Sequence, residues 1–147
     1  MEAPVSRLCR GEHATRDAGR ALGNSIAPGA LVALEGDLGA GKTVFVRGLA
    51  EGLGHDPETV VSPTFVLAVE HPGGRIPLLH VDLYRLAAGA GVDDLGIDEA
   101  LAQGWVVAVE WGERLPPALR DEAWRVILGP AAGLGDDVRA VTILAPA

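Results

Sequence analysis

The residues with the clearest potential for chemistry lie in one short stretch, from Gly36 to Thr43, which reads GDLGAGKT. This spacing is that of a phosphate-binding loop, in which glycines let backbone N–H groups turn toward phosphate oxygens. The lysine would place a positive charge on the β- and γ-phosphates, and the threonine would supply a hydroxyl for Mg²⁺. We therefore predict a nucleotide-binding loop made by Gly39, Ala40, Gly41, Lys42, Thr43 and the backbone N–H of Val44.

The lysine of this loop has no counterpart elsewhere in the chain. Lys42 is the only lysine among the 12 basic residues, and all the others are arginines. A guanidinium is planar and wide, whereas an ammonium on a slim alkyl stem passes beneath a tight backbone loop. Lysine therefore stands where nucleotide chemistry requires it. The chain also has no second lysine for the Asn/Thr-Lys-x-Asp loop with which GTPases select guanine.

Two acidic residues follow apolar stretches that have the character of buried strands. Asp82 follows one such stretch and Glu110 follows another. Carboxyl ends of parallel strands lie at the edge of the sheet that also carries the phosphate loop. Hydrolysis needs carboxylates that hold the metal and its waters and orient the attacking water. We expect both residues to serve the metal and hydrolysis, with Glu110 the closer contact. The alternative is that either carboxylate merely caps the next helix or is solvated.

Four further residues leave two interpretations open. Thr64 lies in a proline-broken loop, where P-loop switches often place a residue that senses the γ-phosphate or Mg²⁺, but ordinary turn chemistry fits equally. Trp111 follows Glu110 and is expected to pack in the core or to form a mobile wall of the site. His80 lies within an apolar strand and is interpreted as a core residue, since the histidines show no metal-ligand spacing. Cys9 has no partner cysteine and is expected to be a small, partly buried side chain.

The pattern of apolar residues predicts alternating helices and strands around these groups. Helices are expected over residues 12–27, from the end of the phosphate loop to Gly52 or Gly54, and over 96–103. Buried strands are expected over residues 31–34, 76–81 and 105–109. An exposed loop leading into a strand is expected over 60–69, and a hairpin over 124–128 and 138–144.

Length and charge limit the classes of protein that the chain can belong to. The 147 residues, 48% of them apolar, fit one compact domain over 1–147. A net charge of −8 argues against a chain that holds nucleic acid unaided, so DNA is not expected as a partner and RNA would be held by a partner protein. The chain has no secretory signal and no apolar stretch that would span a bilayer, so we expect a cytoplasmic protein without membrane contact.

Five motifs in order along nearly the whole chain resemble the TsaE (YjeE) family. They are GDLGAGKT at 36–43, SPTF at 62–65, HVDLYRL at 80–86, LGIDEAL at 95–101 and VEWGERL at 109–115. The resemblance implies an ATPase needed for the N6-threonylcarbamoyladenosine (t6A) modification of adenosine 37 in tRNAs that read codons starting with A. It also implies a partner, the TsaB–TsaD complex, in which TsaD performs the transfer while ATP hydrolysis supports repeated turnover. The implied fold is α/β, a P-loop three-layer sandwich with a mixed, mainly parallel central sheet and antiparallel edge strands.

The resemblance also implies roles for individual residues. Phosphate and Mg²⁺ binding fall to Lys42 and Thr43, and the metal and hydrolysis to Asp82 and Glu110. Thr64 would lie in a switch-like loop, and Trp111 would lie beside the nucleotide site. Thr15 would lie near the adenine pocket.

Two positions depart from the family pattern. The family commonly has GKTT where this chain has Val44, and SPTY where it has Phe65. Val44 lacks a hydroxyl that would touch the α-phosphate, so we expect somewhat weaker ATP binding with hydrolysis retained. Phe65 lacks only a phenol hydroxyl.

Two other functions fit the phosphate loop. A P-loop small-molecule kinase would need an acceptor pocket and a lid with several arginines, but the arginines after Asp82 are scattered. A nucleotide-gated assembly factor would use ATP binding, with hydrolysis dispensable, to join a partner.

Overall fold

Short apolar runs form the centre of a seven-stranded sheet in the computed structural model, which describes residues 5–37, 39–63, 67–86 and 91–146. The strands are β1 (Val5–Arg10), β2 (Leu31–Glu35), β3 (Ala68–His71), β4 (Leu78–Asp82), β5 (Val106–Glu110), β6 (Trp124–Pro130) and β7 (Val138–Leu144). Every residue of β2, β4 and β5 is buried, as expected for strands covered on both faces.

The order of the strands is β1-β7-β6-β2-β5-β4-β3. The central strands β6, β2, β5 and β4 are mutually parallel, because β2 pairs with both β6 and β5, and β5 pairs with β4. The outer pairs, β6 with β7, β7 with β1, and β4 with β3, are antiparallel. The predicted mixed sheet with a parallel centre and antiparallel edges is therefore confirmed.

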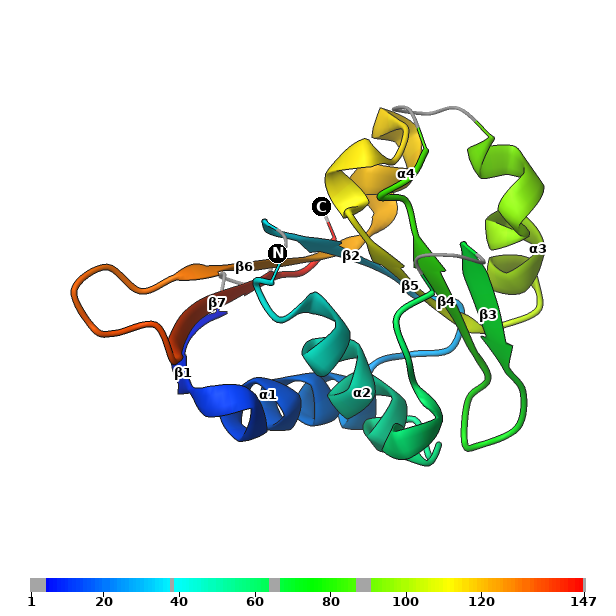
Figure 1. Ribbon diagram of the computed structural model, residues 1–147. Coiled ribbons are helices and arrows are strands. Elements are labelled where there is room, and N and C mark those ends of the chain that lie inside the picture. The colour runs from blue at the N-terminus through cyan, green and yellow to red at the C-terminus, as the bar shows by residue number, and fades with distance from the viewer. Residues whose placement is uncertain (1–4, 38, 64–66, 87–90, 147) are drawn as a thin grey trace.

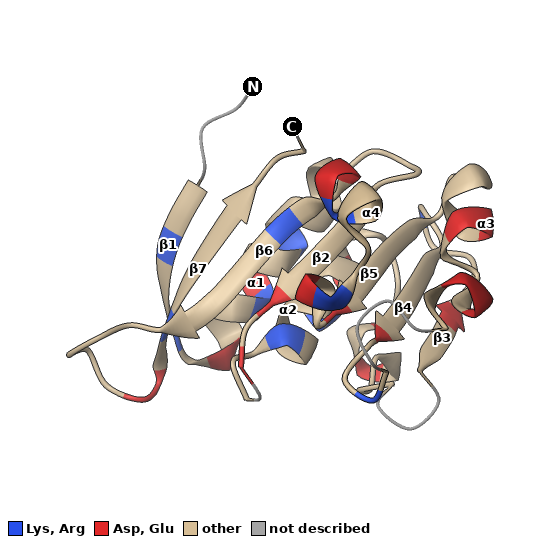
Figure 2. Ribbon diagram, turned by 90° about the horizontal axis from the view of Figure 1, so that it is seen from above, with Lys and Arg blue, Asp and Glu red and all other residues tan. Residues whose placement is uncertain are grey.

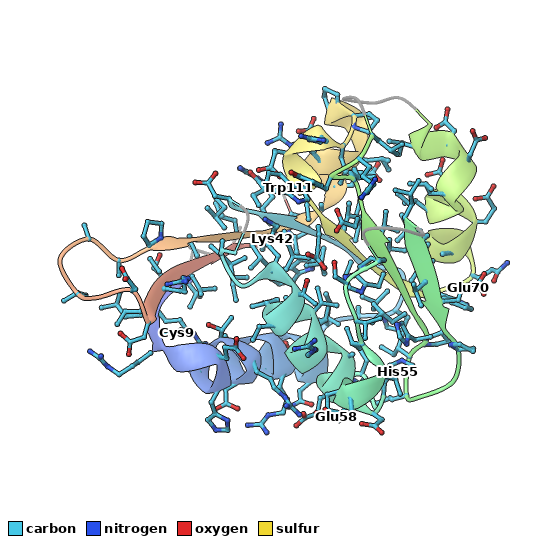
Figure 3. All side chains as sticks on the ribbon, in the orientation of Figure 1. Cys9, Lys42, His55, Glu58, Glu70 and Trp111 are labelled. Carbon is cyan, nitrogen blue, oxygen red and sulfur yellow. The ribbon has the colours of Figure 1, made fainter. Side chains whose placement is uncertain are left out.

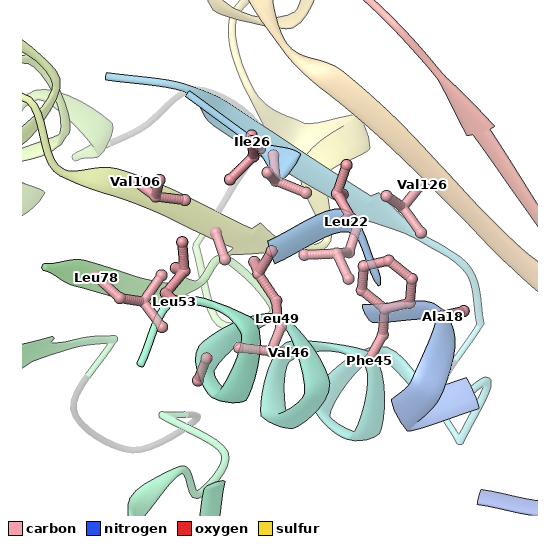
Figure 4. Close-up of a cluster of buried hydrophobic side chains, with 14 of the residues drawn as sticks. Ala18, Leu22, Ile26, Phe45, Val46, Leu49, Leu53, Leu78, Val106 and Val126 are labelled. Atoms are coloured by element: carbon pink, nitrogen blue, oxygen red, sulfur yellow. The ribbon is translucent and has the colours of Figure 1, made fainter. Parts of the chain in front are cut away.

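Helices cover both faces of this sheet (Figure 1). They are α1 (Gly11–Ser25), α2 (Lys42–Gly52), α3 (Ile97–Ala102) and α4 (Pro117–Glu122), with 3₁₀ turns η1 (Pro57–Thr59), η2 (Val92–Leu95) and η3 (Gly112–Arg114). α1 and α2 lie below the sheet in Figure 1, and their apolar side chains form a buried cluster that includes Leu22, Phe45 and Leu49 (Figure 4). A second cluster, with Val81 and Ile97, lies on the opposite face. The arrangement is the expected three-layer sandwich.

The two helices on one face approach each other so closely that glycine is required between them. A Cβ atom at Gly48 would lie 1.9 Å from the carbonyl oxygen of Arg16, and one at Gly19 would lie 2.1 Å from that of Phe45. Beside this contact the Arg16 guanidinium donates to the Glu51 carboxylate at 2.7 Å. α1 is therefore fixed against α2, which begins at the phosphate loop.

Two elements were not predicted from the sequence. β1 is an edge strand with mostly exposed residues, and it is defined by its pairing with β7 from Val5↔Ile143 to Arg10↔Val138. α4 has only six residues and begins with a proline. Neither shows the apolar periodicity on which sequence-based assignment depends. The helices and strands that were predicted are present. The first helix ends at Ser25, and the strand predicted from residue 76 begins at Leu78.

Two further features of the fold concern the single cysteine and the length of the helices. Cys9 is a free cysteine near the end of β1, as the lack of a second cysteine requires, and at 1% exposure it is more buried than expected. Within the described part of the chain, no helix combines the length and the apolar character that crossing a membrane requires.

Candidate functional site

The predicted phosphate loop joins the end of β2 to the start of α2. Gly41 has φ of +103°, a left-handed conformation that favours glycine, and it precedes α2 without any side-chain hydrogen bond that caps the helix. The first N–H groups of α2 therefore have no side-chain acceptor at the cap. Such an uncapped N-terminus combines free donors with the positive end of the helix dipole, and both attract an anion.

Lys42 lies beneath this loop. Its Nζ donates to the carbonyl oxygens of Gly36 at 2.5 Å and Asp37 at 2.9 Å, and it lies 3.9 Å from the centre of the Trp111 ring (Figure 3). The residue is only 5% exposed, so burial lowers the pKa of its ammonium, while nearby carboxylates, that of Glu110 first, act in the opposite direction. The ammonium is held only by neutral carbonyls and an aromatic face. Negatively charged phosphate oxygens would interact with it more strongly and could replace them.

Asp82 and Glu110 meet at the same edge of the sheet. They are register partners at the ends of β4 and β5, and each is 3% exposed. The Asp82 carboxylate accepts a hydrogen bond from the backbone N–H of Tyr84 at 2.8 Å. The residues that directly follow Asp82 form a turn and not a helix, so its carboxylate closes this turn instead of capping a helix, and it also lines the wall of the site.

Glu110 links three elements of the site. The Thr43 hydroxyl at the start of α2 lies 2.9 Å from each Glu110 carboxylate oxygen, and its proton is donated to them. His80 on β4 lies 2.6 Å from Glu110 through its Nε2 and Oε2. His80 is fully buried, as expected of a core residue, but its hydrogen-bond partner is the candidate catalytic carboxylate. Sequence reasoning did not identify this link, because the two residues are on different strands.

Trp111 forms one wall of the site in a strained backbone conformation. Its φ of +60° is rare for a residue other than glycine. The ring lies 5.2 Å from that of Tyr84, and the Arg114 guanidinium carbon lies 5.4 Å from its centre. Arg114 also donates to the backbone carbonyl oxygens of Tyr84 at 2.5 Å and Leu86 at 3.0 Å. Arg114 therefore joins the chain after β5 to the chain after β4, next to Trp111.

These groups surround a cavity of about 450 Å³, which is within the usual range for a small-molecule site. Of the predicted site residues, the cavity wall includes Thr15, Gly39, Gly41, Lys42, Thr43, Val44, Asp82, Glu110 and Trp111. Ala40 instead lines a neighbouring cavity of about 460 Å³, in which Gly39 and Arg139 also take part. The prediction for Thr64 falls outside the described residues.

The cavity wall also contains residues that were not predicted. They are Gly11, Glu12, Ser62, Tyr84, Asp137 and Arg139. Glu12 is one helical turn before Thr15, and Tyr84 lies within the same motif as Asp82, so proximity in the sequence was an available signal for these two. Nothing local indicated Asp137 and Arg139, which come from the turn between β6 and β7 and from β7 itself.

The donor set is suited to a hard divalent cation. The Thr43 hydroxyl and the Glu110 and Asp82 carboxylates offer oxygen ligands, which Mg²⁺ prefers. Among the described residues no group of three or more His, Cys, Asp or Glu side chains forms a metal site complete in itself. Mg²⁺ is usually held by one or two carboxylates together with substrate phosphates, so a site that depends on a nucleotide is consistent with this finding.

Comparison with known proteins identifies one family. The model of the family "Threonylcarbamoyl adenosine biosynthesis protein TsaE" matches residues 9–133. A TsaE protein of Streptomyces coelicolor is 46% identical over 132 residues, which cover 87% of this chain and 88% of the relative. A TsaE protein of Bacillus subtilis is 42% identical over 118 residues, or 80% of this chain and 71% of the relative. Both relatives are described as tRNA threonylcarbamoyladenosine biosynthesis proteins.

The fold also matches a solved structure. The crystal structure of YdiB from Bacillus subtilis superimposes with a TM-score of 0.75 at 31% sequence identity. The match covers 100% of this chain and 88% of the other. Sequence and fold therefore lead to the same group of proteins.

Proposed function

Because this chain belongs to the TsaE family of tRNA threonylcarbamoyladenosine biosynthesis proteins, we propose that it is a Mg²⁺-dependent ATPase that supports the t6A modification of adenosine 37. One observation carries the proposal. Lys42, Thr43, Asp82 and Glu110 come from three separate segments of the chain and line one cavity at the uncapped N-terminus of α2.

Each residue has a distinct part in the proposed reaction. The N–H groups at the start of α2 would hold the β- and γ-phosphates, and Lys42 would exchange its carbonyl partners for phosphate oxygens. The Thr43 hydroxyl donates its proton to Glu110, so the lone pairs of the Thr43 oxygen would be available to Mg²⁺. Mg²⁺, when bound, would offset negative charge on the phosphates. Glu110 would orient the attacking water and accept its proton, while Asp82 would hold water around the metal.

The charge of the molecule supports an indirect relationship with tRNA. The net charge is −8, and acidic residues of η2 and the first turn of α3 are concentrated at one end of the molecule (Figure 2). A surface of this kind repels phosphates. We therefore propose that the protein acts in the cytoplasm on the TsaB–TsaD complex, and that tRNA is held by that complex.

The test is ATP turnover by the purified protein, alone and with TsaB–TsaD, together with t6A formation on a tRNA substrate. We expect slow phosphate release from the protein alone and faster release with the complex. Lys42→Ala should abolish both turnover and ATP binding. Glu110→Ala should abolish turnover while ATP still binds, because of these two side chains the lysine is the one proposed to contact phosphate.

Two results would favour the other functions that fit the phosphate loop. Transfer of phosphate to a small molecule instead of to water would identify a kinase. Full t6A formation by Glu110→Ala without any hydrolysis would identify a nucleotide-gated assembly factor.

A further inference from the structure

The buried histidine beside Glu110 is the feature that the proposed reaction leaves without a role. His80 is 0% exposed, and its Nε2 lies 2.6 Å from Glu110 Oε2. Its register partner on β5 is Ala108, and Glu110 is the diagonal neighbour on the same face of the sheet. A small residue at position 108 leaves room on that face for the imidazole to reach the carboxylate.

Packing alone does not account for an imidazole at this position. The Nδ1 atom of His80 is buried without a hydrogen-bond partner among the described residues. A buried polar atom of this kind carries a desolvation cost that a leucine or valine would avoid. The two residues that alternate with His80 on this face of β4 are Leu78 and Asp82, so the histidine stands between the apolar core and the catalytic edge. The contact with Glu110 is what the imidazole adds.

The two partners of Glu110 constrain its carboxylate differently. The Thr43 hydroxyl lies 2.9 Å from both carboxylate oxygens, so its single proton does not select between them. His80 Nε2 contacts Oε2, and we assign the donor role to the imidazole because a carboxylate in its ionised form only accepts hydrogen bonds. Oε2 therefore has two neighbouring donors, His80 and Thr43, whereas Oε1 has only Thr43 and keeps more capacity to accept a further hydrogen bond.

We propose that His80 is a positioning residue that fixes the rotation of the Glu110 carboxylate, so that Oε1 faces the water and metal of the nucleotide site. The inference rests on the proposed function, because the step that it assists is hydrolysis. His80 itself touches neither the nucleotide nor the cavity, whose wall does not include it among the described residues. Its effect is therefore expected on turnover and on the coupling between Mg²⁺ and ATP, and not on ATP binding without metal.

A matched pair of variants tests this role. His80→Gln places an amide donor near the position of Nε2, whereas the shorter amide of His80→Asn does not reach it. We expect His80→Asn to lower kcat by about tenfold or more, since a misplaced catalytic group loses a large part of its effect. We expect His80→Gln to restore most of that loss. His71→Asn is the control, because His71 is a partly buried histidine on the neighbouring strand β3 and does not line the cavity.

Calorimetric titration with ATP, with and without Mg²⁺, gives a second measurement that does not depend on turnover. In His80→Asn the gain in affinity produced by Mg²⁺ should shrink, while affinity for metal-free ATP stays within about twofold of wild type, as it should in the control. In a Glu110→Gln background, His80→Asn should have no further effect on either quantity, because the group that it positions is already disabled.

Several outcomes would overturn the proposal. They are wild-type kcat and Mg²⁺ coupling in His80→Asn, an equal loss in His80→Gln, or a loss of metal-free ATP affinity that matches the loss of kcat. If the wild-type protein hydrolyses no ATP with its partners, the proposed function fails, and the Mg²⁺ coupling of the two His80 variants still decides whether the histidine positions Glu110.

Discussion

Asp82 and Glu110 are the last register pair of β4 and β5, side by side at the carboxyl edge of the sheet. The two carboxylates are 28 positions apart in the chain and almost completely buried. Two buried groups of like charge repel each other unless a cation lies between or beside them. The Lys42 ammonium interacts favourably with both carboxylates and offsets part of this repulsion, and we expect a bound Mg²⁺ to offset the rest.

Replacing Asp82 with asparagine should have opposite effects on the metal-free protein and on Mg²⁺-dependent ATP binding. Asp82→Asn keeps the oxygen that accepts from the Tyr84 N–H but removes one of the two charges. We expect the melting temperature of the metal-free protein to rise by a few degrees, equivalent to about 1 kcal/mol, while the Mg²⁺-dependent gain in ATP affinity falls. Thermal denaturation without nucleotide and calorimetric titration with ATP measure the two effects. A lower melting temperature in the absence of metal would contradict the like-charge argument.

Two neighbouring residues in the first turn of α2, Thr43 and Val44, provide matched substitutions of a single hydroxyl. Thr43→Val removes the hydroxyl that contacts Glu110, and Val44→Thr adds one where the TsaE family commonly has it. We expect Thr43→Val to lose at least about tenfold of the Mg²⁺-dependent affinity for ATP, since a hydrogen bond to a charged group contributes about 1.5–3 kcal/mol. We expect Val44→Thr to bind ATP several-fold more tightly, because the new hydroxyl can reach the α-phosphate.

Nucleotide titrations of both variants and of the wild type provide the comparison. ADP serves as the control ligand for Val44→Thr, because it retains the α-phosphate. An unchanged affinity of Val44→Thr for both nucleotides would show that valine carries no cost at this position.

The close contact between α1 and α2 should tolerate no side chain at its centre. In Gly48→Ala the new methyl group would lie 1.9 Å from the Arg16 carbonyl oxygen, so the helices must separate. Overpacking of this kind typically costs about 1–3 kcal/mol, and here two backbones must move. Gly129→Ala is the control, because a Cβ atom there has no neighbour within 4 Å. Urea denaturation should show a large loss of stability for the first variant and almost none for the second.

The ion pair beside that contact gives a prediction for acid pH. Hydrogen bonds from Arg16 hold the pKa of Glu51 below its usual value of 4.5. A carboxylate whose pKa is lower in the folded state stabilises the fold above its unfolded pKa and loses this contribution as the pH falls through the folded value. Glu51→Gln should therefore be less stable than wild type at pH 7. The difference should begin to shrink near pH 4.5 and disappear once the pH is below the lowered pKa of the folded state.

Glu58 provides the control for this ion pair. Its carboxylate lies 3.8 Å from Arg16 and is 80% exposed, so Glu58→Gln should hardly change stability at any pH. Denaturation midpoints measured from pH 3 to 7 compare the two variants, and parallel curves for Glu51→Gln and wild type would contradict the assignment.

Much of the fold followed from local patterns in the chain. The buried strands β2, β4 and β5 are mostly apolar, with His80 the polar residue in the middle of β4. Their terminal carboxylates could be assigned to one edge because parallel strands share an orientation. The edge strand β1 and the short helix α4 could not be assigned in this way. β1 is exposed and exists through its pairing with β7, and α4 is too short for a helical period to be visible.

Some residues of the candidate site could likewise be predicted from the sequence, and others could not. The phosphate loop and its lone lysine are recognisable from residue types and spacing, because backbone conformation in a tight loop depends on neighbouring residues. The two strand-end carboxylates are recognisable because each ends an apolar strand of a parallel sheet. The tertiary structure alone brings His80 to Glu110 and Arg139 to the cavity. These contacts join residues that are tens of positions apart, and strand register and hairpin direction decide them, neither of which is encoded in a local pattern.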